Sequence, residues 1–428
     1  AKAGATGIVN LSASNETVGK DTYRKSLIAA TSARLLCGYV YASAGDGEST
    51  QDLVFSGHHM IAENGSVLAE AARFENETIF SELDIHKICH ERRRMSTFVP
   101  ENTETCVRIG FALEKEETKL TRTFAQTPFV PSDETLKKER CEQILSIQAQ
   151  GLKKRYEHTG AKTAVIGVSG GLDSTLALLV TARAFDLLGK DRNDILAVTM
   201  PCFGTTNRTY ENACRLAQTL GAKLIEVNIR EAVQVHFRDI GQDMDKHDVT
   251  YENGQARERT QVLMDLANQS NGLVIGTGDM SELALGWATY NGDHMSMYGV
   301  NGSIPKTLVK YLVEWVANHK VDDASRLTLL DIVDTPISPE LIPADENGNI
   351  KQKTEDLVGP YELHDFFLYH FLRFGSHPSK IYFLAQKAFA GIYDNATVKK
   401  WLYTFCRRFF QQQFKRSCLP DGPKVGSV

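Results

Sequence analysis

Residues 163–175 read TAVIGVSGGLDST, and they carry the clearest strand–loop–helix pattern in the sequence. The first six of these residues, Thr163–Val168, form an apolar run of the length and β-branched content typical of a buried strand. Two glycines and several hydroxyl residues follow at once, and a second apolar run extends from Thr175 to Leu188. That length is typical of a helix. The stretch therefore predicts a buried strand, a short glycine loop and a helix that starts at the loop.

The same alternation continues downstream. We expect strands at 195–200, 223–227 and 273–276, and a helix near 210–220. An alternating order of strands and helices favours a parallel sheet with helices packed on both faces. The sequence therefore predicts an α/β fold with a Rossmann-like, doubly wound parallel sheet, in which ligands bind outside the carboxyl ends of the strands. Further helices are expected at 364–374 and 398–414.

A second α/β pattern lies upstream of this sheet. Strand-like runs at 6–11, 38–43 and 51–55 accompany a helical pattern at 22–36. These elements predict a first unit that reaches residue 112. Residues 113–132 then combine charge clusters with prolines, a composition typical of a linker. We expect a second domain over residues 133–428.

Bulk composition limits the functions open to the chain. With 428 residues, 42% hydrophobic and 24% charged, the sequence predicts two folded domains. The net charge of -5 gives no general attraction to nucleic acid or anionic lipid, and no apolar run approaches the roughly 18 residues of a membrane helix. The eight cysteines form no Cys-x-x-Cys pair, which favours reduced thiols. We therefore expect a cytoplasmic protein without nucleic-acid or membrane partners.

The glycine loop carries groups suited to a phosphate. Gly170 and Gly171 allow the backbone close to an anion, and the hydroxyls of Ser169, Ser174 and Thr175 can donate hydrogen bonds. The helix start adds N–H groups and positive potential. The alternative is a glycine turn followed by a capping serine. The lysine of the Walker loop is missing here.

Two carboxylates on the same sheet edge suggest a magnesium site. Asp173 lies within the loop, and Glu282 follows the strand at 273–276 in the segment GTGDMSELALGW, residues 276–287. Carboxylate and phosphate oxygens are ligands that magnesium prefers. We expect Asp173 and Glu282 to hold the metal and Thr277 to touch the nucleotide. The alternative for Glu282 is a solvated helix residue.

The string Ser169–Ser174 resembles the SGGxDS loop of the ATP pyrophosphatase family. That resemblance implies an adenine nucleotide alpha hydrolase-like fold and cleavage of ATP between its α and β phosphates. The segments 251–257, 287–294, 300–307, 336–341, 413–416 and 420–425 make residues 133–428 similar, more specifically, to NAD synthetases. This likeness implies ATP and Mg²⁺ as cofactors and deamido-NAD as substrate, with Lys306 near the reacting phosphates and Ser338 near ATP. The residues that it implies for deamido-NAD binding are Asn253, Glu282, Trp287, Tyr290, Asp293 and Lys415.

The resemblance implies that a carboxylate of deamido-NAD is adenylated and that ammonia then displaces AMP. The physical requirements agree, since a dinucleotide needs cations such as Lys306 and Lys415 and an aromatic platform such as Trp287. Two alternatives stay open: another synthetase of the ATP pyrophosphatase type, or a nucleotide-binding subunit without catalysis. Each lysine also has the ordinary alternative of a solvated side chain. The family further implies a homodimer of synthetase domains or a larger homo-oligomer.

Residues 1–112 resemble the latter part of a nitrilase-like glutaminase domain. The likeness rests on 10–20 and 38–50, and it implies that Ser14 and Lys20 hold glutamine. The family's catalytic cysteine lies upstream of residue 10, so we expect the chain as given to depend on ammonia. Cys37 is expected to be a buried thiol, not a substitute nucleophile. The pair His86 and His90 favours a solvated amphipathic helix over a metal site.

Overall fold

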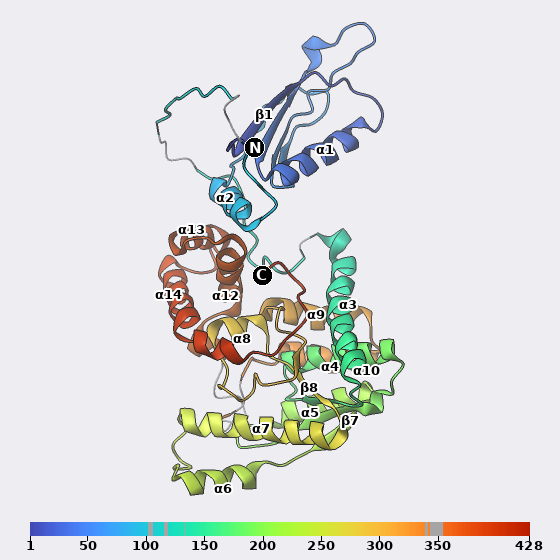
Figure 1. Ribbon diagram of the computed structural model, residues 1–428, viewed down its shortest axis with the longest axis vertical. Coiled ribbons are helices and arrows are strands. Elements are labelled where there is room, and N and C mark those ends of the chain that lie inside the picture. Colours follow the sequence, from blue (N-terminus) through green and yellow to red (C-terminus); the bar gives the residue numbers. More distant parts are fainter. Residues whose placement is uncertain (102–105, 115–118, 132, 339–340, 343–353) are drawn as a thin grey trace. The chain divides into compact units, whose positions relative to one another are not determined.

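The structure is a computed structural model that describes residues 1–101, 106–114, 119–131, 133–338, 341–342 and 354–428. The chain divides into two compact units. The first contains Ala1–Phe124 and His370–Lys380, and the second contains Ala125–Tyr369 and Ile381–Val428. Residues 115–118 and 132 of the expected linker lie outside the described residues. Figure 1 shows the course of the chain through both units.

The second unit is built on a parallel sheet. Its strands are β5 (Ala164–Gly167), β6 (Ile195–Thr199), β7 (Lys223–Glu226), β8 (Leu273–Gly276) and β9 (Tyr298–Gly299). They lie in the order β7-β6-β5-β8-β9, and every paired neighbour runs parallel. The sequence predicted the first four. The doubly wound α/β sheet is therefore confirmed, and β9 was not anticipated because it has only two residues.

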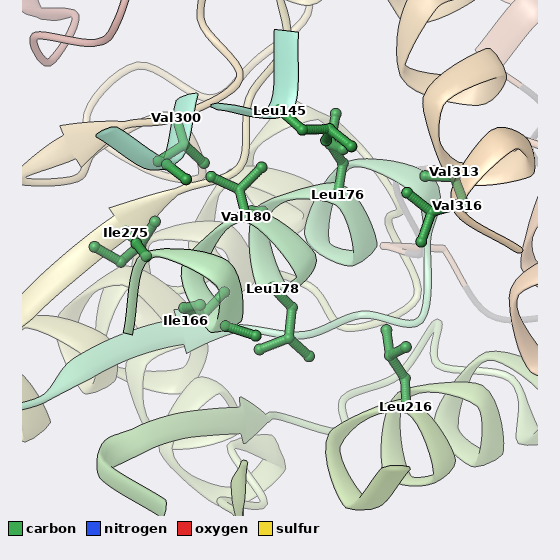
Figure 2. Close-up of a cluster of buried hydrophobic side chains, with 14 of the residues drawn as sticks. Leu145, Ile166, Leu176, Leu178, Val180, Leu216, Ile275, Val300, Val313 and Val316 are labelled. Atoms are coloured by element: carbon green, nitrogen blue, oxygen red, sulfur yellow. The ribbon is translucent and has the colours of Figure 1, made fainter. Parts of the chain in front are cut away.

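Helices cover both faces of this sheet. On one side lie α3 (Glu134–Thr159), α4 (Leu172–Leu188), α5 (Asn207–Thr219), α9 (Lys306–His319) and α10 (Asp323–Asp334). On the other lie α6 (Arg230–Ile240) and α7 (Val249–Ser270). Alternate residues of β5 contribute to the two cores, since Ile166 packs with the α4 side and Val165 with the α7 side. Figure 2 shows the core around α4, where Leu176, Leu178 and Val180 point away from the helix axis into the surrounding apolar layer.

The later part of the chain is helical, and most of it belongs to the second unit. Its elements are α8 (Met280–Leu285), α11 (Thr354–Val358), α12 (Tyr361–Leu368), α13 (Pro378–Ala388), α14 (Asn395–Gln411) and the 3-10 helix η4 (Gln413–Cys418). The helix expected over 364–374 is interrupted, because a π-helical turn, η3 (Tyr369–Arg373), follows α12. The second expected helix is confirmed as α14, which ends slightly earlier than predicted.

The first unit contains a four-stranded mixed sheet. Strand β1 (Gly7–Ser12) runs parallel to β2 (Gly38–Ser43), and α1 (Lys20–Leu35) connects them. The sheet continues through β3 (Met60–Glu63) and β4 (Ser66–Glu70), both antiparallel to their neighbours. Helix α2 (Ile85–Arg94) follows.

One predicted strand of this unit is wrong. Residues 51–55, all of which the structure describes, form no strand and make a single isolated bridge, Thr50 to Leu53. Gln51 has a left-handed backbone with φ of 44°, and the side chains of Leu53 and Val54 are exposed. An apolar run that finds neither a buried face nor a ladder partner does not become a strand.

Two further expectations about this unit are met. Cys37 is fully buried, and burial raises the pKa of its thiol. The segment with His86 and His90 is the amphipathic helix α2, which buries Ile88 and exposes His86. Among the described residues, no helix combines the length and the apolar character needed to cross a membrane.

Candidate active site

The loop between β5 and α4 is shaped by one close backbone approach. Gly170 has φ of +79°, and a Cβ at this position would lie 2.0 Å from the carbonyl oxygen of Thr209, in the first turn of α5. Any side chain here would therefore collide with backbone. Gly171 is the N-cap residue of α4 and supplies no side-chain cap, so the first N–H groups of the helix face outward. The loop has the geometry of an anion-binding turn.

The hydroxyls of the loop are placed differently from one another. Ser169 and Ser174 lie 3.4 Å apart through their Oγ atoms, and both line the adjoining cavity. Thr175 is fully buried and donates its hydroxyl to the carbonyl oxygen of Gly171 at 2.8 Å. Thr175, expected to donate to a phosphate, therefore uses its hydroxyl within the helix.

A cavity of about 420 Å³ opens at the carboxyl ends of the central strands. This is the sheet edge at which the sequence places the ligand. Eleven of the residues singled out from the sequence line it: Ser169, Gly171, Asp173, Ser174, Asn253, Thr277, Glu282, Trp287, Asp293, Ser338 and Lys415. Gly170, Thr175, Tyr290 and Lys306 are not among the described lining residues, and Ser14 and Lys20 belong to the first unit. Residues 339–340, next to Ser338, lie outside the described part of the chain.

Three carboxylates and one lysine meet at the wall of the cavity. Asp173, Asp279 and Glu282 each offer a carboxylate oxygen, and these atoms lie within 4.8 Å of one another. The Nζ atom of Lys306 lies 2.6 Å from Asp173, 2.5 Å from Asp279 and 2.9 Å from Glu282. Sequence reasoning expected Asp173 and Glu282 to converge, and they do. It expected Lys306 near phosphates, whereas here the buried ammonium group pairs with all three acids.

Asp279 was missed by sequence reasoning, although a signal exists. It caps α8, and its Oδ1 accepts hydrogen bonds from the backbone N–H groups of Ser281 at 2.7 Å and Glu282 at 2.9 Å. An aspartate three residues before a glutamate, directly after a strand, is the pattern of a helix start. Its position at the carboxyl end of β8 could have marked it as a site residue.

The electrostatics of this group favour an added cation. Burial raises the pKa of Asp173 to about 7 against the opposing effect of Lys306, and burial likewise raises the pKa of Glu282 well above its ordinary value. Burial tends to lower the pKa of Lys306, but the three carboxylates raise it well above its usual range. With all four groups ionised, the three carboxylates and the one ammonium group leave the cluster with two negative charges in excess. Within the described part of the chain, the buried Oδ1 of Asp173 has no hydrogen-bond partner. These groups fit a divalent cation with oxygen ligands.

Asn301 ties the two strand-end loops together. Its Nδ2 donates to the carbonyl oxygens of Asp173 at 2.9 Å and Thr277 at 3.0 Å, and its Oδ1 accepts from Gln148 at 3.2 Å. The side chain is fully buried. Asn301 therefore fixes the spacing between the glycine loop and the loop after β8. The sequence offered no signal for this role, because the contact between Asn301 and Asp173 joins residues more than a hundred positions apart.

The other end of the cavity is formed by the loop after α8. Thr289 organises it, since its hydroxyl donates to Oδ1 of Asn253 at 2.7 Å and its backbone N–H donates to Asp293 at 2.7 Å. The structure thus brings Asn253 and Asp293 together around a residue that the sequence analysis did not select. Tyr290 packs instead against Phe414, with ring centroids 5.6 Å apart.

Two cations stand beside this loop. Lys415, from η4, donates to the carbonyl oxygens of Gly286 at 3.0 Å and Ala288 at 2.6 Å. Arg408, from α14, lies 5.2 Å from the ring centroid of Trp287 and also lines the cavity. Lys415 was expected from the sequence and Arg408 was not. In the first unit, Lys20 donates to the side-chain oxygen of Asn15 at 2.9 Å, next to Ser14.

Comparisons with known proteins agree on one family. A family model described as NAD synthase matches residues 144–325. The chain is 43% identical over 459 residues to a glutamine-dependent NAD(+) synthetase of Mycobacterium leprae, covering 99% of this chain and 67% of the relative. A relative of the same name from Mycobacterium tuberculosis (strain ATCC 25618 / H37Rv) is 42% identical over 462 residues, with the same coverage. A solved glutamine-dependent NAD(+) synthetase from Cytophaga hutchinsonii shares the fold, with a TM-score of 0.54 and 18% identity over 98% of this chain and 66% of that chain.

Proposed function

This chain belongs to the family of glutamine-dependent NAD(+) synthetases, and we propose on that basis that it is a ligase that amidates deamido-NAD to NAD at the expense of ATP. The observation that carries the site assignment is the buried cluster of Asp173, Asp279, Glu282 and Lys306 beside the glycine loop. In this reaction a carboxylate of deamido-NAD attacks the α-phosphorus of ATP and releases pyrophosphate. Ammonia then attacks the acyl carbon and releases AMP.

The glycine loop is the proposed site for the ATP phosphates. Gly170 lets the loop lie against the backbone of Thr209, and the free N–H groups at the start of α4 attract negative charge. Ser169 and Ser174 line the same cavity, and the Ser169 hydroxyl can donate to a phosphate oxygen, whereas the Ser174 hydroxyl donates to the carbonyl oxygen of Gly171 at 3.1 Å. Thr277 and Ser338, also at the cavity wall, are proposed to contact the nucleotide.

Asp173, Glu282 and Asp279 are the proposed ligands of a magnesium ion. When bound, Mg²⁺ would neutralise charge that builds up on the phosphate oxygens during adenylation. Lys306 has a related task in this proposal, because its buried ammonium group holds the three carboxylates together at the cavity wall and offsets part of their charge. No nucleophilic side chain is needed, since both nucleophiles come from the substrates. The protein contributes placement and charge.

The far end of the cavity is the proposed site of deamido-NAD. Trp287 offers an aromatic face, while Lys415 and Arg408 supply positive charge for an anionic dinucleotide. Asn253 and Asp293 are held in place through Thr289 and can form hydrogen bonds with the substrate. In the first unit, Ser14 and Lys20 are proposed to hold glutamine as the nitrogen donor.

A product analysis tests this function. The chain is incubated with ATP, Mg²⁺, deamido-NAD and an ammonium salt, because ammonium supplies the nitrogen without a need for glutamine hydrolysis. We expect NAD, AMP and pyrophosphate in equal amounts, measured by chromatography. Formation of ADP and phosphate, or no conversion of deamido-NAD, would contradict the proposal.

A further inference from the structure

A buried carboxylate behind the cavity connects two of the helices that build the site. Asp365, on α12, is fully buried, and its neighbours Phe366 and Phe367 are fully buried as well. Its Oδ2 accepts hydrogen bonds from the backbone N–H of Thr307 at 2.9 Å and from the hydroxyl of Thr307 at 2.6 Å. Its Oδ1 accepts a hydrogen bond from the hydroxyl of Ser281. Three donors therefore converge on one carboxylate.

The direction of these hydrogen bonds is fixed by the chain itself. The backbone N–H of Lys306 donates to the Oγ atom of Ser281 at 2.9 Å. The Ser281 hydroxyl must then give its own hydrogen to Asp365, which acts as acceptor for every partner. A chain of hydrogen bonds thus runs from the backbone N–H of Lys306 through the Ser281 hydroxyl to Asp365. Thr307, the residue after Lys306, donates to the same carboxylate directly.

Ser281 and Thr307, the two residues that donate to Asp365, are each next in sequence to a residue of the carboxylate–lysine cluster. Ser281 lies directly before Glu282 in the first turn of α8, and Thr307 lies directly after Lys306 in the first turn of α9. Asp365 does not line the cavity among the described residues and lies too deep to touch a ligand there. What it can control is the relative position of two helix starts, one carrying Glu282 and the other carrying Lys306.

We propose that Asp365 is a positioning residue for the amidation reaction, which sets the place of Lys306 and Glu282 by clamping the first turns of α9 and α8. This inference rests on the proposed function. Burying a carboxylate in an apolar layer is unfavourable unless its hydrogen bonds are satisfied, and Asp365 meets that condition by joining these two turns. A shift of about 1 Å in a catalytic group can lower a rate on the order of 100-fold.

The main test replaces Asp365 by asparagine. Asp365→Asn keeps the size of the side chain, but its amide nitrogen is a donor and must face either Ser281 or Thr307, which also donate. We expect kcat for NAD formation to fall about 30- to 100-fold, with KM for ATP and deamido-NAD changed less than about threefold. Asp394→Asn is the matched control, because Asp394 caps α14 and does not line the cavity; its kinetics should equal those of the wild type.

A double variant separates positioning from a general structural effect. If Asp365 acts by placing Lys306 and Glu282, Asp365→Asn should lower kcat by a much smaller factor in the Lys306→Ala background than in the wild type, because one of the two placed groups is gone. Independent, multiplying losses in the double variant would overturn the inference. The thermal midpoint of each variant is measured alongside, so that loss of folded protein is not counted as loss of rate.

Two substitutions of Thr307 test the same inference if Asp365→Asn does not fold. Thr307→Ser keeps the hydroxyl that donates to Asp365 and should retain the wild-type kcat, whereas Thr307→Ala removes it and should lower kcat about three- to tenfold. Equal kcat values for the two Thr307 variants would sink the proposal. A wild-type chain that forms no NAD from ammonium would instead refute the proposed function, so the two failures are distinguishable.

Discussion

At the scale of single residues, the most constrained position of the site is Gly170. Its left-handed φ of +79° disfavours any other residue, and its missing Cβ leaves room for the Thr209 carbonyl oxygen, which would lie 2.0 Å from a Cβ. Gly170→Ala should therefore push the loop away from α5. We expect KM for ATP to rise at least about tenfold, because the phosphate-binding N–H groups move with the loop. Steady-state kinetics with varied ATP measures this.

Gly189→Ala is the control for this prediction. Gly189, the C-cap of α4, also has a left-handed φ, +64°, but a Cβ there would meet nothing within 4 Å. The control variant should lose about 1 kcal/mol of unfolding free energy and keep the wild-type KM. If Gly170→Ala and Gly189→Ala behaved alike, the close contact with Thr209 would not be what shapes the ATP site.

The site residues that could be predicted are those that stand out from their neighbours in the sequence. Asp173 and Glu282 follow strands and face one another, which the strand–loop–helix pattern implies. Asn301 and Arg408 were missed because their roles depend on contacts between segments far apart in the chain. Lys306 was selected, yet its pairing with three carboxylates could not be seen before Asp279 was placed beside it.

At the scale of secondary-structure elements, α12 contains a buried histidine that should make the folded state acid-sensitive. The Nε2 atom of His364 lies 2.6 Å from the carbonyl oxygen of Val358, and in the described part of the chain its buried Nδ1 has no partner. Burial lowers the pKa of His364 to about 4, and the charge of Arg408 acts in the same direction. The folded protein therefore holds this ring neutral at pH values where the unfolded chain protonates it.

The direction of the change in stability with pH follows from which state binds the proton more tightly. Since the unfolded state takes up the proton first, the stability contribution is complete above pH 6.5 and is lost between pH 6.5 and about 4, by about 3 kcal/mol in total. His364→Gln cannot titrate in this range. Urea unfolding between pH 7 and pH 4.5 should show the wild type losing its advantage over the variant as pH falls. A constant difference across that range would contradict the assignment.

Elements were predictable where the apolar pattern and the final environment agree. The run at 163–168 became β5 because both of its faces are covered, and the apolar run after the glycine loop became α4. The run at 51–55, which holds only three apolar residues after Gln51 and Asp52, remains outside the sheet, whereas β3, Met60–Glu63, is fully buried and was not expected. Composition alone does not say which short apolar run will find a partner strand.

At the scale of the whole molecule, the two compact units do not follow the order of the sequence. A boundary was expected within 113–132, and the first unit extends to Phe124. The sequence could not show that His370–Lys380, more than two hundred residues later, belongs to the first unit as well. Arg373 pairs there with Glu91, and the Nζ atom of Lys380 lies 2.6 Å from both carboxylate oxygens of Asp84. Such pairings follow from tertiary placement and leave no local pattern.

The pair of Lys380 and Asp84 should therefore help to hold the distant segment in the first unit. Both side chains are about three-quarters buried, and Lys380 helps to keep the pKa of Asp84 low against the raising effect of burial. Asp84 also caps α2, so losing its partner affects that helix. We expect Lys380→Met and Asp84→Asn to show a coupling free energy of about 1–2 kcal/mol. Hydrogen exchange of peptides from residues 1–94 can measure it.

The exposed pair of Lys25 and Glu70 is the comparison that decides this prediction. Its Nζ–O distance is also 2.6 Å, but the lysine side chain is 51% exposed, so solvent screens the interaction and the coupling should stay below about 0.5 kcal/mol. If burial and not distance makes an ion pair matter here, the coupling free energies of the two pairs must differ although their shortest Nζ–O distances are equal. Equal coupling in both cycles would mean that the segment His370–Lys380 is held by its other contacts, such as Arg373 with Glu91.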